Sequence, residues 1–274
     1  MSSPEVLAAA GAGEGARAAI ELEAVGLRYF TPDAEIEAVS GISLQVQAGE
    51  FVSLIGPSGC GKSSLLSLIA GIQAPTAGRI LIDGREVTGP NPRVGYMLQQ
   101  DYLFEWRSIL DNCLLGAEIQ GLPLGEARER ALHLLSQCGL GEFARRYPRE
   151  LSGGMRQRAA LVRTLVTAPD VVLLDEPFSA LDAQTRLAIS DDIVDILKRE
   201  RKTIVLVTHD IGEAISMTDR VVVLGRRPGH IKSEHRIHFA AGTGRPTPLQ
   251  ARAMPEFNAY FQALWKELDV HVED

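Results

Sequence analysis

A glycine-rich segment in the first quarter of the chain has the residue types that bind phosphate. It reads Gly-Pro-Ser-Gly-Cys-Gly-Lys-Ser from Gly56 to Ser63. Glycines let backbone N–H groups turn toward phosphate oxygens, and the helix that follows would add the positive end of its dipole. Lys62 is expected to reach the β- and γ-phosphates of a nucleotide, and the Ser63 hydroxyl is expected to bind Mg²⁺. The nucleotide contacts predicted in this segment are Gly56, Pro57, Ser58, Gly59, Cys60, Gly61, Lys62, Ser63 and Ser64.

A second group of candidate residues follows an apolar strand in the later part of the chain. The run Val171 to Leu174 leads directly into Asp175 and Glu176. Ligands of open α/β sheets bind at the carboxyl ends of the strands, so Asp175 is placed to hold Mg²⁺, directly or through water. Glu176 is placed to take a proton from an attacking water, a role worth about 10²–10⁴ in rate. The alternative is that one of these acids only caps the next helix.

A Ser-Gly-Gly segment shortly before this strand is a third candidate. Ser152 suits a helix N-cap, and a helix N-terminus attracts anions. Taken alone, the segment equally marks an ordinary cap or turn. In a chain that also has a phosphate loop and an Asp-Glu strand end, we predict that Ser152, Gly153 and Gly154 contact the nucleotide.

The elements that must position these residues alternate between strand and helix patterns. Ile42–Val46 has period two, and Phe51–Ile55 is an apolar strand that runs into the glycine loop. Buried runs alternating with helices predict a parallel α/β sheet. The other predicted strands are Arg79–Asp83, Val171–Leu174, Thr203–Val207 and Val221–Leu224, and the predicted helices are Lys62–Ala70, Leu114–Gln120, Gly125–Cys138, Met155–Val166, Arg186–Arg199, Asp210–Met217 and Asn258–Leu268.

Composition sets limits on the class of protein. The chain has 274 residues and a net charge of −7, which argues against a nucleic-acid binder. Its three cysteines are too few and too scattered for a disulfide framework or a zinc site, although a thiol reagent is expected to reach Cys60 in the glycine loop. Residues 1–19 are expected to form a disordered tail. No run approaches the ~20 apolar residues of a membrane span, so a membrane role would work through a partner.

Together these motifs resemble the nucleotide-binding subunit of ATP-binding cassette (ABC) transporters over about residues 20–240. The resemblance implies a P-loop NTPase core with a mostly parallel sheet, an N-terminal antiparallel β part, and a helical subdomain inserted at about residues 100–167. Residues 241–274 would then be a C-terminal extension with an amphipathic helix. The resemblance also implies ATP and Mg²⁺ as cofactors, and two subunits facing head to tail. The Ser-Gly-Gly segment of each would close on the phosphate loop of the other.

The resemblance adds further site residues. Tyr29 resembles the aromatic residue that stacks on adenine, and Phe30 is its competitor because strand faces alternate. Gln99 resembles the glutamine that senses Mg²⁺ and the attacking water, although Gln100 adjoins it. The preceding Val-Gly-Tyr-Met-Leu run favours Gln99 for this catalytic and metal-binding role.

Two more residues follow from the family pattern in the second half of the chain. Asp182 lies in a Ser-Ala-Leu-Asp loop that would cross the dimer and contact nucleotide. His209 resembles the switch histidine, a catalytic residue. It follows a buried strand and precedes a capping-box-like helix start at Asp210, so it should emerge at the same sheet edge as Asp175. Met155 stands where many relatives have glutamine, which removes a polar contact to the ribose.

Two stretches resemble the branch of the family that energises uptake of nitrate, sulfonates and taurine. They are Gly225–Ile231 and Phe104–Ser108, and thiamine-precursor importers share much of the pattern, so the cargo stays open. The expected partners are a second ATPase subunit in a homodimer, transmembrane permease subunits and, indirectly, an extracytoplasmic solute-binding protein. The segment from Gln99 to Asn112 would dock on the permease, with Phe104 and Trp106 as anchors. The chain would then be peripheral, at the cytoplasmic face of the inner membrane.

Two other functions compete with ATP-driven import. One is a soluble ABC ATPase without a transport role, for example in cofactor assembly. The other is a small-molecule kinase that uses the same phosphate loop. The Ser152 segment and the Asp182 loop would have no role in such a kinase.

Overall fold

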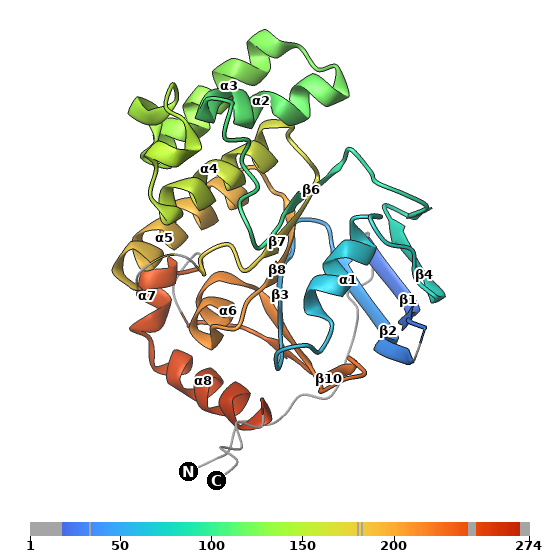
Figure 1. Cartoon of the computed structure of the whole chain (residues 1–274). Helices are drawn as coiled ribbons and strands as arrows, with labels where there is room; N and C mark the ends of the chain where they lie inside the picture. Colours follow the sequence, from blue (N-terminus) through green and yellow to red (C-terminus); the bar gives the residue numbers. More distant parts are fainter. Residues whose placement is uncertain (1–17, 33, 180, 182, 241–244, 269–274) are drawn as a thin grey trace.

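The computed structural model describes residues 18–32, 34–179, 181, 183–240 and 245–268 (Figure 1). Within these ranges the strands form two sheets, one of six strands in the order β10-β9-β3-β8-β7-β6 and one of four in the order β2-β1-β4-β5. A group of helices lies at one end of the larger sheet, and the smaller sheet lies beside it (Figure 1). This arrangement confirms the predicted α/β fold class.

The six-stranded sheet is parallel except at one edge. Strands β3 (Phe51–Ile55), β7 (Val171–Asp175) and β8 (Thr203–Val207) are buried at every position, as expected for strands covered on both faces. They pair in parallel with one another and with β6 and β9. The remaining strands are β6 (Val94–Met97), β9 (Arg220–Leu224) and the antiparallel edge strand β10 (Ile231–Arg236).

The four-stranded sheet is antiparallel and flanks the phosphate loop. It contains β1 (Ala18–Phe30), β2 (Glu35–Gln47), β4 (Ala77–Ile82) and β5 (Arg85–Glu86). Helix α1 (Lys62–Ile69) contributes buried leucines to a core shared by strands of both sheets. This packing fixes the helix that follows the phosphate loop. Strand β1 begins at Ala18, within the range expected for the tail, and residues 1–17 lie outside the described ranges.

The helical region between β6 and β7 is built from three helices and two short 3₁₀ turns. Helix α3 buries one face, which consists of Ala127, Ala131, Leu134 and Leu135 at helical spacing. The last helix of the region starts at the Ser-Gly-Gly segment, so this segment forms the N-terminus of that helix. The elements are α2 (Ile109–Gln120), α3 (Leu124–Gln137), η1 (Gly141–Phe143), η2 (Pro148–Glu150) and α4 (Gly153–Val166).

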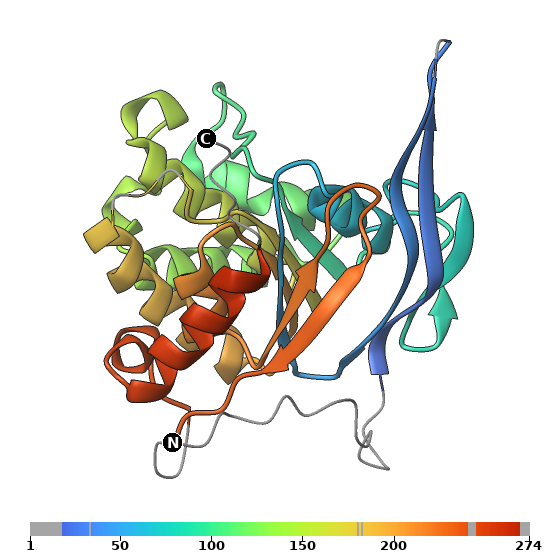
Figure 2. The same cartoon turned by 90° about the horizontal axis from the view of Figure 1, so that it is seen from below.

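The C-terminal helices pack back on the sheet. Helix α8 (Pro255–Glu267) buries Phe257 and Leu264 against residues of α6 and β9. Figure 2 shows α7 and α8 in red on one side of the orange β9–β10 strands and the blue β1–β2 hairpin on the other. The extension therefore contacts the parent domain along its apolar face. The remaining helices are α5 (Ala183–Arg199), α6 (Ile211–Met217) and α7 (Pro248–Arg252).

Candidate nucleotide site

The phosphate loop adopts a backbone that depends on glycine. Gly59 and Gly61 have φ values of +76° and +94°, in the left-handed region that side chains disfavour. A Cβ at Gly61 would lie 2.8 Å from Val39 Cγ2, and a Cβ at Gly56 would lie 2.8 Å from the carbonyl oxygen of Leu224. The loop is therefore held closely between β2 and β9, and its shape follows from the sequence.

Lys62 begins α1 and turns its ammonium group back over the loop. Its Nζ donates to the carbonyl oxygens of Gly56 at 2.8 Å and Pro57 at 2.9 Å. The N-cap residue, Gly61, offers no side-chain hydrogen bond to the first turn of the helix, so those N–H groups have no side-chain cap. Cys60 is only 1% exposed, so the expectation that a thiol reagent reaches it is wrong.

Asp175 ends β7 beside the first turn of α1. The Ser63 hydroxyl donates to Asp175 Oδ1 at 3.2 Å. Asp175 is 4% exposed, and burial raises the pKa of its carboxyl, with the Ser63 hydrogen bond acting in the opposite direction. A hydroxyl and a carboxylate side by side are oxygen ligands of the kind that Mg²⁺ prefers, so this pair fits the predicted metal.

Three loops that follow β6, β7 and β8 converge on the Glu176 carboxylate. Gln99 Nε2 donates to Glu176 Oε2 at 3.0 Å. His209 Nδ1 lies 3.5 Å from the same oxygen. The carboxyl ends of neighbouring parallel strands thus bring together the three residues that the sequence predicted to be catalytic. Of the adjacent glutamines, it is Gln99 whose side chain reaches this carboxylate.

The backbone at Glu176 is also unusual. Its φ is +48°, in the left-handed region, although it has a side chain. Its N–H donates to the carbonyl oxygen of Val207 at 2.9 Å, which ties it to β8. Such a conformation costs on the order of 1–3 kcal/mol and is concentrated at functional sites. The strain fixes the direction in which the carboxylate leaves the sheet.

Tyr29 and Phe30 lie at the end of β1 and face different ways. The Tyr29 hydroxyl is 3.2 Å from Ser64 Oγ and donates to Gln73 Oε1 at 3.2 Å. Its ring therefore lies toward α1 and the phosphate loop. Phe30 is 72% exposed.

Ser152 caps α4, as its sequence position predicts. Its Oγ accepts a hydrogen bond from Met155 N at 3.3 Å. A Cβ at Gly154 would lie 2.3 Å from Leu181 Cδ2, so the start of α4 packs against the residue that precedes Asp182. Asp182 itself lies outside the described residues. Within the described part of one chain, no hydrogen bond or ion pair joins residues 151–154 to residues 56–64.

Sequence reasoning missed some residues that support the site. Tyr96 on β6 hydrogen-bonds Asp175, and burial raises the pKa of Tyr96 to about 12, so it stays a neutral hydroxyl. Arg163 of α4 donates to the carbonyl oxygens of Asp101 at 2.6 Å and Tyr102 at 2.8 Å. This arginine joins α4 to the loop that begins with Gln99. The sequence pattern does not mark Tyr96, because its place beside Asp175 depends on the pairing of β6 with β7.

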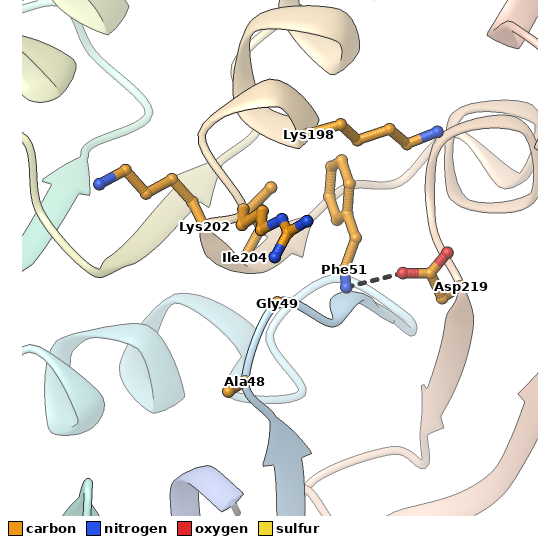
Figure 3. A pocket seen from close by; sticks show the side chains of 8 residues that line it. Ala48, Gly49, Phe51, Lys198, Lys202, Ile204 and Asp219 are labelled. Carbon is orange, nitrogen blue, oxygen red and sulfur yellow. Dashed lines mark hydrogen bonds between the residues drawn. The ribbon is translucent and has the colours of Figure 1, made fainter. Parts of the chain in front are cut away.

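A separate pocket of about 390 Å³ lies at the opposite edge of the sheet, where β3 and β8 begin. Figure 3 shows Lys198 and Lys202 pointing away from each other, while Asp219 accepts a hydrogen bond from Phe51 N. The two ammonium groups therefore do not converge on one point of the pocket (Figure 3). Among the described residues, every helix is too short or too polar to span a lipid bilayer.

Comparison with known proteins identifies the family to which this geometry belongs. A family model described as ABC transporter matches residues 39–179. The uncharacterized ABC transporter ATP-binding protein YtlC of Bacillus subtilis is 49% identical, covering 88% of this chain and 92% of the relative. The taurine import ATP-binding protein TauB of Roseobacter denitrificans is 40% identical, covering 81% of this chain and 83% of the relative.

A solved structure agrees with these relatives. It is a dimeric ATP-binding cassette in a post-hydrolysis state, bound to ADP and Pi. It matches with a TM-score of 0.73 at 31% identity and covers 80% of this chain and 99% of the other. The chain therefore belongs to the ABC transporter family, as one of its ATP-binding cassette ATPases.

Proposed function

We propose that this chain is the ATP-hydrolysing subunit of a membrane importer for a small solute. The convergence of Gln99 and His209 on the Glu176 carboxylate, at the edge where Lys62 and Asp175 lie, supports hydrolysis. The relatives named as taurine import proteins support uptake, as do the Gly225–Ile231 and Phe104–Ser108 stretches. The cargo class is nitrate-, sulfonate- or taurine-like, or a thiamine precursor.

Each residue at this edge has a role that follows from its position. Glu176 accepts a proton from the attacking water, and Gln99 orients that water. His209 contacts the γ-phosphate, which Lys62 and the loop N–H groups hold. Tyr29 stacks on adenine.

Ser63, Asp175 and Gln99 would hold Mg²⁺. The ion would neutralise the negative charge on the phosphate oxygens. The adjacent hydroxyl and carboxylate of Ser63 and Asp175 support this assignment.

The working unit in this proposal is a dimer of two such chains. In one chain, the Ser152–Gly154 turn has no hydrogen bond to the phosphate loop among the described residues, so it is available to a partner. A second copy placed head to tail would bring this turn and Asp182 over the nucleotide held by Lys62. The N-terminus of α4 would then face the γ-phosphate with its unpaired N–H groups.

The permease partner would dock on the segment from Gln99 to Asn112. Phe104 and Trp106 stack with ring centroids 4.8 Å apart, and Trp106 is 75% exposed. Phe104 is partly buried and supports the exposed tryptophan, and aromatic side chains of this kind are typical anchors of protein interfaces. The subunit would then sit at the cytoplasmic face of the inner membrane without spanning it, and a solute-binding protein outside would deliver the cargo to the permease.

The decisive experiment is the change Glu176→Gln in the purified chain. It should lower ATP turnover by about 10²–10⁴ while ATP binding and an ATP-dependent dimer remain. Phosphate release and size-exclusion chromatography with ATP measure the two effects, and Lys62→Ala, which should lose binding, is the comparison. Turnover that persists in Glu176→Gln would remove Glu176 from its role as base. Extraction of native membranes then tests transport, since an importer subunit should co-purify with a membrane protein.

A further inference from the structure

A short helix of the C-terminal extension reaches the loop that carries His209. Arg252 ends α7, and its Nη2 lies 3.9 Å from Asp210 Oδ1, next to the histidine in sequence. We propose that Arg252 is a positioning residue for ATP hydrolysis, which holds the His209 loop through Asp210 and makes the C-terminal extension a regulator of turnover. The inference rests on the proposed role of His209.

Both sequence neighbours of His209 are fixed in one hydrogen-bond network. Asp210 Oδ1 accepts from Glu213 N at 3.0 Å, which caps α6. The Asp210 N–H donates to Thr208 Oγ1 at 3.1 Å, and that hydroxyl donates to Glu213 Oε2 at 2.6 Å. The His209 side chain itself is 61% exposed. Thr208 and Asp210, which flank His209, are both hydrogen-bonded to Glu213. A shift of Asp210 would therefore move the histidine.

The network continues to the loop that precedes Asp182. Arg186 Nη1 lies 3.3 Å from Asp210 Oδ2 and 3.6 Å from Glu213 Oε1. Its Nη2 donates to the carbonyl oxygen of Leu181 at 3.0 Å. Arg186 thus connects two loops that the proposed function places at the nucleotide. Arg252 is the second guanidinium at Asp210, on the other carboxylate oxygen.

The position of Arg252 depends on a glycine in α6. A Cβ at Gly212 would lie 2.8 Å from Arg252 Nη1, 2.9 Å from its Nη2 and 2.9 Å from Asp210 Oδ1, so the guanidinium and the carboxylate meet where a side chain would otherwise be. The other face of the guanidinium lies 5.8 Å from the ring centroid of Phe257. Arg252 therefore lies between α6 and α8, with 29% of its side chain exposed.

Helix α7 is held in place by its own cap and by a contact with α5, and this fixes the position of Arg252. Thr247 and Gln250 form a capping box at its start. Leu249 N donates to Asp191 Oδ1 of α5 at 3.1 Å. A movement of the extension relative to α5 would change the contact at Asp210 and with it the histidine loop. This makes α7 a route by which events at the C-terminal extension reach the catalytic edge.

The first test is the change Arg252→Ala in the full chain. Turnover number should fall about 3- to 10-fold while the KM for ATP stays within a factor of about two, since the residue touches the histidine loop and not the nucleotide. Arg252→Lys, which keeps the charge, should recover part of the loss. Arg236→Ala, at an exposed position of β10, is the matched control and should leave turnover unchanged.

A double-mutant cycle shows whether Arg252 acts through Asp210. Asp210→Asn keeps an N-cap of equal quality but removes the charge. Adding Arg252→Ala to Asp210→Asn should then cause no further loss of turnover. Independent losses that multiply, or an unchanged turnover in Arg252→Ala alone, would overturn the inference.

A second variant separates positioning from loss of folding. A methyl group at position 212 would meet both the Arg252 guanidinium and Asp210 Oδ1, so Gly212→Ala should break their contact and lower turnover. Alanine is a better helix former than glycine, and thermal unfolding of this variant and of Arg252→Ala shows whether the chain stays folded when turnover falls. A normal turnover in Gly212→Ala would sink the proposal, and so would a fall in turnover that appears only together with a loss of folded protein. Failure of the proposed function looks different: the unmodified chain would then release no phosphate, or Glu176→Gln would release it at the normal rate.

Discussion

At the scale of single residues, the neighbouring aromatic residues Tyr29 and Phe30 have different surroundings. Tyr29 is held by Ser64 and Gln73, which sets its ring beside the phosphate loop. We expect Tyr29→Ala to weaken ATP binding by about 1–3 kcal/mol, the worth of a base–aromatic stack. Titration with a fluorescent ATP analogue measures this. Tyr29→Phe keeps the ring and should lose less affinity, and Phe30→Ala is the control; equal losses in the two alanine variants would contradict the assignment.

The residues of the site could be named from the sequence because each belongs to a motif with its own chemistry. The glycine loop, Glu176 and His209 are recognisable from their types and their strand ends. The residues that hold these side chains in place were not recognisable, because their roles depend on contacts between distant segments. Tyr96 lies on β6, beside the neighbouring strand that ends in Asp175, and no sequence pattern places Arg252 beside Asp210. The burial of the Cys60 side chain within the phosphate loop was missed for the same reason.

At the scale of elements, α6 begins with a buried carboxyl that should make stability depend on pH. Burial, as the main cause, raises the pKa of Glu213; Asp210 acts in the same direction, and the Thr208 hydroxyl, Arg186 and His209 act against it. The folded chain therefore binds this proton more tightly than the unfolded chain. The stability that Glu213 contributes is greatest below its ordinary pKa and falls as pH rises through its raised folded-state pKa.

The change Glu213→Gln removes this titration. The stability of the unmodified chain relative to Glu213→Gln should decline as the pH rises above 4.5, the ordinary pKa of glutamate. Urea unfolding at several pH values measures the difference, and Glu142→Gln, at an exposed position in η1, provides the control. A difference that stays constant, or that grows in favour of the unmodified chain as pH rises, contradicts this expectation.

Element prediction succeeded where a pattern was long or fully apolar. Strands β3 and β8 have the predicted bounds, since each is a run of apolar residues leading into a turn. Strand β6 was not predicted because its four residues include a glycine. Strand β10 reads Ile-Lys-Ser-Glu-His-Arg and lies at a sheet edge, so it has little apolar signal. Helix α7 is only five residues long and is held by its capping box and its packing.

At the scale of the whole molecule, the Glu176 carboxylate connects two regions. Gln99 begins the loop that Arg163 fastens to α4, and thus to the helical region with the proposed permease anchors. His209 leads through Asp210 to the C-terminal extension. A structural change in the helical region or in the C-terminal extension would therefore reach Glu176 Oε2, the oxygen atom that both Gln99 and His209 approach. This arrangement suits a subunit whose hydrolysis must respond to partners, and in the proposed dimer each nucleotide is shared between two chains.

A mixed dimer tests this sharing directly. Let all chains carry Glu176→Gln, so that bound ATP is retained. In the proposed dimer each composite site joins the phosphate loop of one chain with the Ser152–Gly154 turn of the other. When a Lys62→Ala chain pairs with a Gly153→Asp chain, both defects fall in one composite site, and the other composite site stays intact. It should retain labelled ATP at one site. In Gly153→Asp the new carboxylate sits at the start of α4, where it would repel the γ-phosphate while stabilising the helix end.

The matched control places both changes in one chain and pairs it with a chain that has neither. Each composite site then contains one defect, so no labelled ATP should be retained, although the dimer carries the same substitutions. If instead each chain built its site alone, the unchanged chain of the control would keep ATP and the chain with Gly153→Asp in the mixed dimer would not. Reversal of the two results would therefore show that the Ser152–Gly154 turn serves its own chain.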